Sequence, residues 1–177
     1  LVNQQNVKPI VLAGRTGSGK TLAIHKLNNA IDLEGLAHHR GSAFGRHATP
    51  QPTQINFENN LAMALIRFME KQPKQLVIED EGRNIGSVNF SKELFECFKS
   101  GSRVVVDTPM EERIAITLDE YVIEAQAEYN NIAEWEDFMR AAMQRIQKRL
   151  GGERYQRVMS QFDFAMQAQL NQNSTKN

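Results

Sequence analysis

Residues 14–21 read Gly14-Arg15-Thr16-Gly17-Ser18-Gly19-Lys20-Thr21, which matches the phosphate-binding loop pattern G-x-x-x-x-G-K-S/T at every fixed position. In such a loop the glycines let backbone N–H groups surround a phosphate chain, the lysine reaches the terminal phosphates, and the final hydroxyl ligates Mg²⁺. The helix that begins there adds the positive end of its dipole. The residues expected to contact phosphate are Gly14, Thr16, Gly17, Ser18, Gly19, Lys20 and Thr21, with Thr21 also expected at a metal.

The sequence on both sides of the loop fits this motif. Residues 9–13 form a short apolar run, which is typical of a buried parallel strand, and the residues after Thr21 fit one apolar helix face. Further along, the pattern predicts strands at residues 30–34, 75–78 and 103–107 and helices at 53–71 and 91–99. Alternating strands and helices favour an α/β fold, a P-loop NTPase-like parallel sheet flanked by helices.

The second part of the sequence has a helical pattern. It runs from residue 110 to about residue 150, breaks at Gly151-Gly152, and resumes to about residue 170. We therefore predict an α/β core over residues 1–113, a C-terminal helical extension over 114–170 and a disordered tail over 171–177.

The overall composition indicates a protein of the cytoplasm. The chain has 177 residues, 41% of them hydrophobic, and a formal net charge of zero. No apolar run has the length of a membrane span, and no signal-peptide pattern is present, so we expect no membrane association. The single cysteine, Cys97, cannot form an internal disulfide and is typical of a reducing compartment.

Charge is unevenly distributed in the helical part. Residues 111–138 hold nine acids and one base, whereas residues 139–160 hold six bases and one acid. The basic stretch has the charge to meet nucleic-acid phosphates. The alternative is a solvated pair of helices whose opposite charges satisfy each other.

Acidic residues follow the strand predicted at residues 75–78. In P-loop proteins an acid at this place holds Mg²⁺ directly or through water. Strand alternation puts Asp80 on one face and Glu79 and Glu81 on the other, without showing which face meets the loop. We predict Asp80 as the metal ligand alongside Thr21, with Glu79 as the alternative.

Arg113 lies one turn into the helix that follows Thr108-Pro109. A cation at this point can neutralise charge on a leaving phosphate, although an ion pair with Glu112 or Asp107 is an equal alternative. The predicted catalytic residues are Lys20, Asp80, Glu79 and Arg113.

Residues 35–52 form a long irregular segment rich in Gly, His, Arg, Ser and Pro. Loops of this length inside a compact domain are usually functional. Arg40 and Arg46 have the forked guanidinium that suits anionic oxygens, and Asp32 and Glu34 share one face of the strand predicted at 30–34, where they either bind substrate or form an inert polar edge. The predicted substrate-binding residues are Asp32, Glu34, His39, Arg40, Gly41, Ser42, Arg46 and Arg83.

The run from Asp32 to Gly45, DLEGLAHHRGSAFG, resembles the signature of bacterial tRNA 2-selenouridine synthases. Three further segments support the resemblance, at residues 50–59, 78–86 and 109–113. The resemblance implies an enzyme of two parts. An N-terminal rhodanese-like domain carries a catalytic cysteine, and a phosphate-loop domain follows it. The resemblance implies a transferase acting on 2-thiouridine at the wobble position of tRNA. It implies geranylation with geranyl diphosphate, followed by conversion to 2-selenouridine with selenophosphate.

This resemblance sets the expectations for ligands and partners. The rhodanese-like part is missing from this chain and Cys97 does not replace it, so we expect the chain alone to lack the selenium-transfer step. The expected loop ligand is geranyl diphosphate or ATP/GTP, with Mg²⁺. The expected partner is tRNA, bound through Arg40, Arg46 and residues 139–160, with a prenyl groove in the C-terminal helices. A small-molecule kinase and a nucleotide-gated tRNA-binding module remain alternatives.

Overall fold

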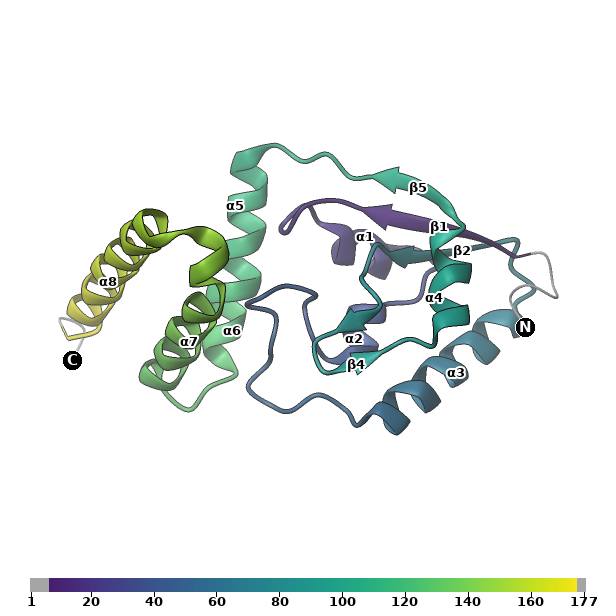
Figure 1. Cartoon of the computed structure of the whole chain (residues 1–177), viewed down its shortest axis with the longest axis horizontal. Coiled ribbons are helices and arrows are strands. Elements are labelled where there is room, and N and C mark those ends of the chain that lie inside the picture. Colours follow the sequence, from purple (N-terminus) through teal and green to yellow (C-terminus); the bar gives the residue numbers. More distant parts are fainter. Residues whose placement is uncertain (1–6, 175–177) are drawn as a thin grey trace. The chain divides into compact units, whose positions relative to one another are not determined.

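A computed structural model of the chain describes residues 7–174 (Figure 1). It divides into two compact units, the first ending at Ile132 and the second beginning at Ala133. The first unit contains the sheet and the phosphate loop, and the second consists of two helices. None of the described helices combines the length and the apolar character needed to cross a membrane.

A parallel sheet forms the centre of the first unit. It contains β1 (Lys8–Ala13), β2 (Gln75–Glu79) and β5 (Ser102–Val105) in the order β2-β1-β5. The central strand β1 places Val11 beside Ile78 of β2 and Arg103 of β5, with both pairings parallel. Parallel neighbours require crossover connections, and helices occupy both crossovers. The predicted α/β class with a flanked parallel sheet is confirmed.

Helices and a small hairpin fill the connections. Between β1 and β2 lie α1 (Lys20–Lys26), α2 (Leu33–Ala37) and α3 (Gln54–Glu70). Between β2 and β5 lie the hairpin of β3 (Asn84–Ile85) and β4 (Val88–Asn89), then α4 (Lys92–Lys99). After β5 the chain forms α5 (Met110–Leu118), the π-helical turn η2 (Asp119–Ile123) and α6 (Glu124–Ala127).

The strand predicted at residues 30–34 is wrong. Only Ala30 makes an isolated bridge, to Val77, and the chain then turns into α2. Asp32 is the N-cap of this helix, because its Oδ1 accepts a hydrogen bond of 2.6 Å from the Gly35 N–H. The apolar alternation of this segment therefore reflects two buried side chains on either side of a helix start. Asp32 and Glu34 do not share a strand face.

The main core lies between β2, α3, α4 and the hairpin. Phe57 of α3 is completely buried and packs against Phe90, with ring centroids 5.5 Å apart. Phe90 in turn meets Phe98 of α4 edge-on at 5.9 Å. A smaller cluster with Leu12 and Ile24 joins α1 to the sheet. This packing fixes the strand ends from which the phosphate loop and the acidic residues emerge.

The first unit extends beyond the core boundary expected after Arg113. The Arg113 guanidinium donates two hydrogen bonds to the Thr16 carbonyl, at 3.1 and 3.2 Å, and Tyr121 donates to the Arg40 carbonyl at 3.2 Å. These contacts attach α5 and η2 to the loops of the sheet, so the division falls after Ile132.

The second unit pairs α7 (Ile132–Leu150) with α8 (Gly152–Ser174). Gly151 joins them with φ of 85°, a value that favours glycine. Trp135 packs on Phe162, and Arg140 pairs with both Glu136 and Asp163. Helix α8 continues beyond residue 170 to Ser174, so the prediction of a disordered tail is wrong for residues 171–174. Residues 175–177 lie outside the described residues.

Replacing Phe57 by Ala should destabilise the first unit by about 3–5 kcal/mol, because a buried ring is lost and a cavity remains. The matched control is Ile55→Ala on the same helix, where the side chain is 70% exposed, and its effect should stay within about 0.5 kcal/mol. Urea denaturation of the three proteins measures both. Equal midpoints for Phe57→Ala and wild type would contradict this assignment of the core.

Candidate functional site

The phosphate loop connects β1 to α1 through a tight backbone turn. Gly17 and Gly19 have φ of 73° and 80°, in the left-handed region. A Cβ at Gly17 would also lie 2.5 Å from the Arg113 carbonyl oxygen, so α5 passes too close for a side chain. Ser18 is buried, and Thr108 donates to its carbonyl at 2.8 Å. The loop is therefore held from two sides by the segment that follows β5.

A cavity of about 280 Å³ lies over this loop. All seven residues predicted to contact phosphate line it: Gly14, Thr16, Gly17, Ser18, Gly19, Lys20 and Thr21. The other lining residues come from α2, from the long loop, from the end of β2 and from η2: Glu34, Arg40, Gly41, Asp80, Glu81, Gly82, Glu120 and Tyr121. The Lys20 ammonium donates to the Gly14 carbonyl at 3.2 Å, so it lies over the loop whose ligand it is expected to meet.

Two carboxyl groups face the loop as a pair. Glu34 accepts a hydrogen bond from the Thr21 hydroxyl at 3.4 Å and is hydrogen-bonded to Glu81. Gly41 packs against both, since a Cβ there would lie 2.8 Å from the Glu81 carboxylate. Burial, together with the charge of Glu34, raises the pKa of Glu81 to about 8, and burial also raises the pKa of Glu34. The pair therefore shares a proton near neutral pH.

Asp80 lies at the edge of the cavity in two ion pairs. Its carboxylate contacts the Lys99 ammonium and, at 2.8 Å, the Arg103 guanidinium. Although partial burial opposes the effect, these cations hold the pKa of Asp80 below its usual value. The metal-binding role predicted for Asp80 stays a prediction. Its carboxylate is already neutralised by two basic side chains, whereas Glu34 is the acid that contacts Thr21.

Glu79 is buried behind the cavity, does not line it, and is only 1% exposed. Its Oε2 accepts a hydrogen bond of 3.0 Å from the Leu33 N–H, which joins the end of β2 to the start of α2. Burial raises its pKa to about 8. Glu79 therefore supports the helix start that carries Glu34, and the catalytic role predicted for it stays a prediction.

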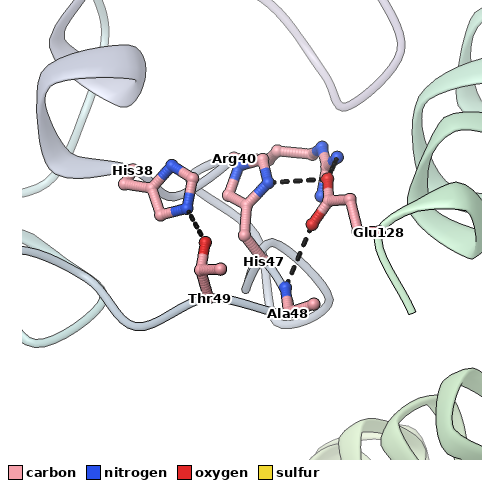
Figure 2. Close-up of polar contacts among 6 residues, drawn as sticks. All are labelled: His38, Arg40, His47, Ala48, Thr49 and Glu128. Carbon is pink, nitrogen blue, oxygen red and sulfur yellow. Dashed lines mark hydrogen bonds and ion pairs between the residues drawn. The ribbon is translucent and has the colours of Figure 1, made fainter. Parts of the chain in front are cut away.

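The long loop is fastened to the end of α6 through Glu128 (Figure 2). This carboxylate accepts hydrogen bonds from the Arg40 guanidinium at 2.7 Å, from His47 Nδ1 at 2.8 Å and from the Ala48 N–H at 3.0 Å. The Arg40 guanidinium also lies over the Tyr121 ring, 5.8 Å from its centroid. Arg40 therefore lines the cavity with its guanidinium already paired.

The other predicted substrate residues occupy different places. Ser42 accepts from the Phe44 N–H within the loop, and Arg46 is exposed, with its backbone bridged to His39. His39 is buried, and burial lowers its pKa. Arg83 donates to the Phe90 carbonyl at 3.1 Å and braces the hairpin instead of lining the cavity.

A second cavity of about 380 Å³ adjoins the first. The two share Thr21, Glu34, Arg40 and Glu120 in their walls. Asp32 and His39, which were predicted to bind substrate, line the second cavity and not the first. The structure thus divides the predicted substrate residues between two adjoining spaces.

Sequence reasoning missed four residues that line the first cavity, Glu81, Gly82, Glu120 and Tyr121, and it also missed Glu128, which holds the long loop. Strand alternation misplaced Glu81, because the chain leaves the pleat after β2 and the Glu81 N–H bonds back to the Glu79 carbonyl at 2.9 Å. Glu120, Tyr121 and Glu128 lie in the acidic stretch 111–138, where nothing in the sequence distinguishes them from their neighbours. Among residues 7–174, no cluster of three or more His, Cys, Asp or Glu side chains is arranged to hold a metal.

Comparison with known proteins identifies the family. The family model described as the tRNA 2-selenouridine synthase AAA domain matches residues 7–177. A protein of Hydrogenovibrio crunogenus named tRNA 2-selenouridine synthase is 57% identical over 165 residues, which are 93% of this chain and 46% of that protein. Proteins of the same name from Sulfurovum sp. and Alcanivorax borkumensis are 51% and 42% identical, over 93% and 94% of this chain and 47% and 48% of their own lengths.

These relatives are longer than the chain, which spans about half the length of the curated proteins it matches. No solved structure matches it. The motif, the fold around it and the similarity over nearly the whole chain agree, and the chain therefore belongs to the tRNA 2-selenouridine synthase AAA-domain family.

Proposed function

We propose that the chain is the diphosphate-binding domain of a tRNA-modifying transferase, which geranylates wobble 2-thiouridine with geranyl diphosphate. Replacement by selenium from selenophosphate then requires the remainder of the longer protein. The names of the relatives support the tRNA substrate. The observation that carries the proposal is the 280 Å³ cavity, in which the complete phosphate loop faces the hydrogen-bonded carboxyl groups of Glu34 and Glu81.

Prenyl transfer makes a demand that this cavity can meet. Breaking the bond between C1 of the prenyl group and the diphosphate oxygen leaves negative charge on the diphosphate. Lys20, the loop N–H groups and the N-terminus of α1 place positive charge where it develops. Arg113 acts as a positioning residue, because its two hydrogen bonds to Thr16 hold the loop in shape.

The acids of the cavity make binding depend on cations and protons. Four carboxyl groups, those of Glu34, Asp80, Glu81 and Glu120, surround a space that an anion must enter. The Thr21 hydroxyl and the carboxylates of Glu34 and Glu81 are hard oxygen donors, which fit Mg²⁺. Bound there, Mg²⁺ would supply the charge that offsets repulsion between these acids and the diphosphate. ATP or GTP in the same loop is the alternative ligand.

The tRNA has two candidate contacts outside the cavity. Arg46 projects from the long loop as an exposed cation, whereas the Arg40 guanidinium is held by Glu128. In the second unit, residues 139–160 carry six basic side chains, which lie on α7 and α8. Such contacts depend on salt, because binding releases counterions from the nucleic acid.

Lys20→Ala should weaken binding of geranyl diphosphate with Mg²⁺ by about 10- to 100-fold, since a charged hydrogen-bond donor to the diphosphate is lost. Lys26→Ala, an exposed lysine of the same helix, is the control and should bind as wild type does. Isothermal titration calorimetry measures both. Absence of heat with the wild-type chain would contradict the proposal, and steady ATP turnover with a phosphorylated small product would favour a kinase instead.

Glu81→Gln should remove a pH dependence of stability. The pKa of Glu81 rises on folding from 4.5 to about 8, so the folded chain binds the proton more tightly between these values. The free energy of unfolding of the wild type therefore falls as pH increases from about 5 to 8. In Glu81→Gln the free energy of unfolding should decrease less between about pH 5 and pH 8. The exposed control Glu70→Gln should show the same decrease as wild type, and urea midpoints at both pH values measure the difference. Identical slopes for wild type and Glu81→Gln would show that the acids are not paired.

Arg46→Ala should weaken tRNA binding several-fold at low salt and reduce the slope of log affinity against log salt by about one. Arg67→Ala, which removes an exposed arginine of α3, is the matched control. Filter binding across a salt series gives the slopes. A slope for Arg46→Ala equal to that of wild type would exclude Arg46 from the phosphate contacts.

A further inference from the structure

We propose that the second cavity is the acceptor site, which takes the planar 2-thiopyrimidine base, and that His25, oriented by Asp32, receives the proton that this base loses. The inference rests on the proposed function, because it names where the second substrate binds relative to the diphosphate. The cavity has a volume of about 380 Å³, which is within the range of small-molecule sites.

The position of this cavity suits an acceptor. It shares Thr21 and Glu34 with the diphosphate cavity, so a ligand in one space lies next to a ligand in the other. A transfer reaction needs the donor carbon and the acceptor atom held in contact without water between them. Two cavities that share four lining residues bring the two ligands to the same side chains, which is the proximity that this arrangement requires.

The lining of the cavity favours a nucleobase over a prenyl chain or a phosphate. All four histidines of the chain line it, and His38 and His47 stack with ring centroids 4.1 Å apart and planes 15° apart. Flat rings of this kind are the surfaces on which bases stack. The cavity is also lined by the acids Asp32, Glu34, Glu120 and Glu124, which repel phosphate but accept hydrogen bonds from ring N–H groups. Leu22 is its one aliphatic side chain larger than alanine.

His25 and Asp32 form a dyad in the wall of this cavity. His25 Nε2 lies 2.7 Å from Asp32 Oδ2, and the other carboxylate oxygen of Asp32 is fixed by the Gly35 N–H at the start of α2. An ionised carboxylate can only accept, so it favours the tautomer with the proton on Nε2. Nδ1 is then left with a lone pair. The His25 side chain is 59% exposed, so a ligand can reach it.

The proposed reaction needs such a proton acceptor. The sulfur of the base attacks C1 of the prenyl group, and the C–O bond breaks with its electron pair passing to the diphosphate. The C2=S bond becomes single as the N3–H electron pair forms the N3=C2 double bond. The N3 proton passes to Nδ1 of His25. Atoms and charges balance without any oxidant or reductant.

Imidazole NMR tests the pocket directly. The wild-type chain has four histidines, and all of them line the cavity, so titration with 2-thiouridine nucleoside should shift their Hε1 resonances. Lys20→Ala should retain this response and lose the response of the loop amides to pyrophosphate with Mg²⁺. No imidazole shift in a chain that binds pyrophosphate would overturn the inference alone. An imidazole shift without pyrophosphate binding would instead reject the proposed function of the loop.

Kinetics test the dyad. With 2-thiouridine tRNA and geranyl diphosphate, His25→Gln should lower kcat about 100-fold with KM unchanged, because proton transfer is lost and base binding is not. Lys26→Gln is the matched control on the same helix. Asp32→Asn keeps a good N-cap but changes the partner of Nε2, so it should lower kcat with KM and thermal midpoint retained. Wild-type kcat in His25→Gln would overturn the assignment of the proton acceptor.

Discussion

The clamp of α5 on the phosphate loop is the contact on which the site depends. The loop has left-handed backbone at Gly17 and Gly19, a conformation that glycine adopts readily, but glycine is also flexible, so the shape of the loop depends on the contacts that hold it. Arg113 supplies that support from α5 through the Thr16 carbonyl, and Thr108 supplies it through the Ser18 carbonyl. Because Arg113 and Thr108 both follow β5, their hydrogen bonds join the end of β5 to the phosphate loop that follows β1.

Electrostatics then give the site its character. A phosphate loop alone attracts anions, but here it faces Glu34 and Glu81, whose mutual repulsion is relieved by a shared proton. Burying two ionised carboxylates side by side costs more free energy than burying one, because their charges repel each other. The pair therefore favours binding of a proton or a cation. We therefore expect the cavity to favour anions that arrive together with a positive charge, as in the proposal of a diphosphate with Mg²⁺. This feature fits a diphosphate better than an isolated carboxylate or sulfate ligand.

The sequence allowed the fold class and the phosphate loop to be predicted because each depends on local pattern. The loop motif fixes its own backbone, and buried strands and capped helices such as the one starting after Thr53 have a clear signature. The predictions failed where contacts between distant parts of the chain determine the local structure. Asp32 was predicted in a strand, whereas its side chain caps a helix. Glu81 was grouped with Glu79, whereas the chain turns directly after β2 and separates the two side chains.

The partners of Glu128 were beyond sequence reasoning for a related reason. Arg40 and His47 come from a loop more than eighty positions earlier, and no local pattern links them to one acid within an acidic stretch. The second cavity has the same origin, since its histidines and acids come from α1, α2, the long loop, η2 and α6. Such sites follow from topology, which brings separate segments to one edge of the sheet.

Glu128 has a mechanical consequence as well. Glu128 lies four positions before Ile132, the last residue of the first unit. The same acid therefore restrains both the long loop and the connection into α7. Arg40 also lines the cavity, so an occupant that draws its guanidinium inward competes with Glu128 for it. Where that competition releases Glu128, the chain between α6 and α7 loses one of its restraints, so an event at the strand ends would be felt at the last residues of the first unit.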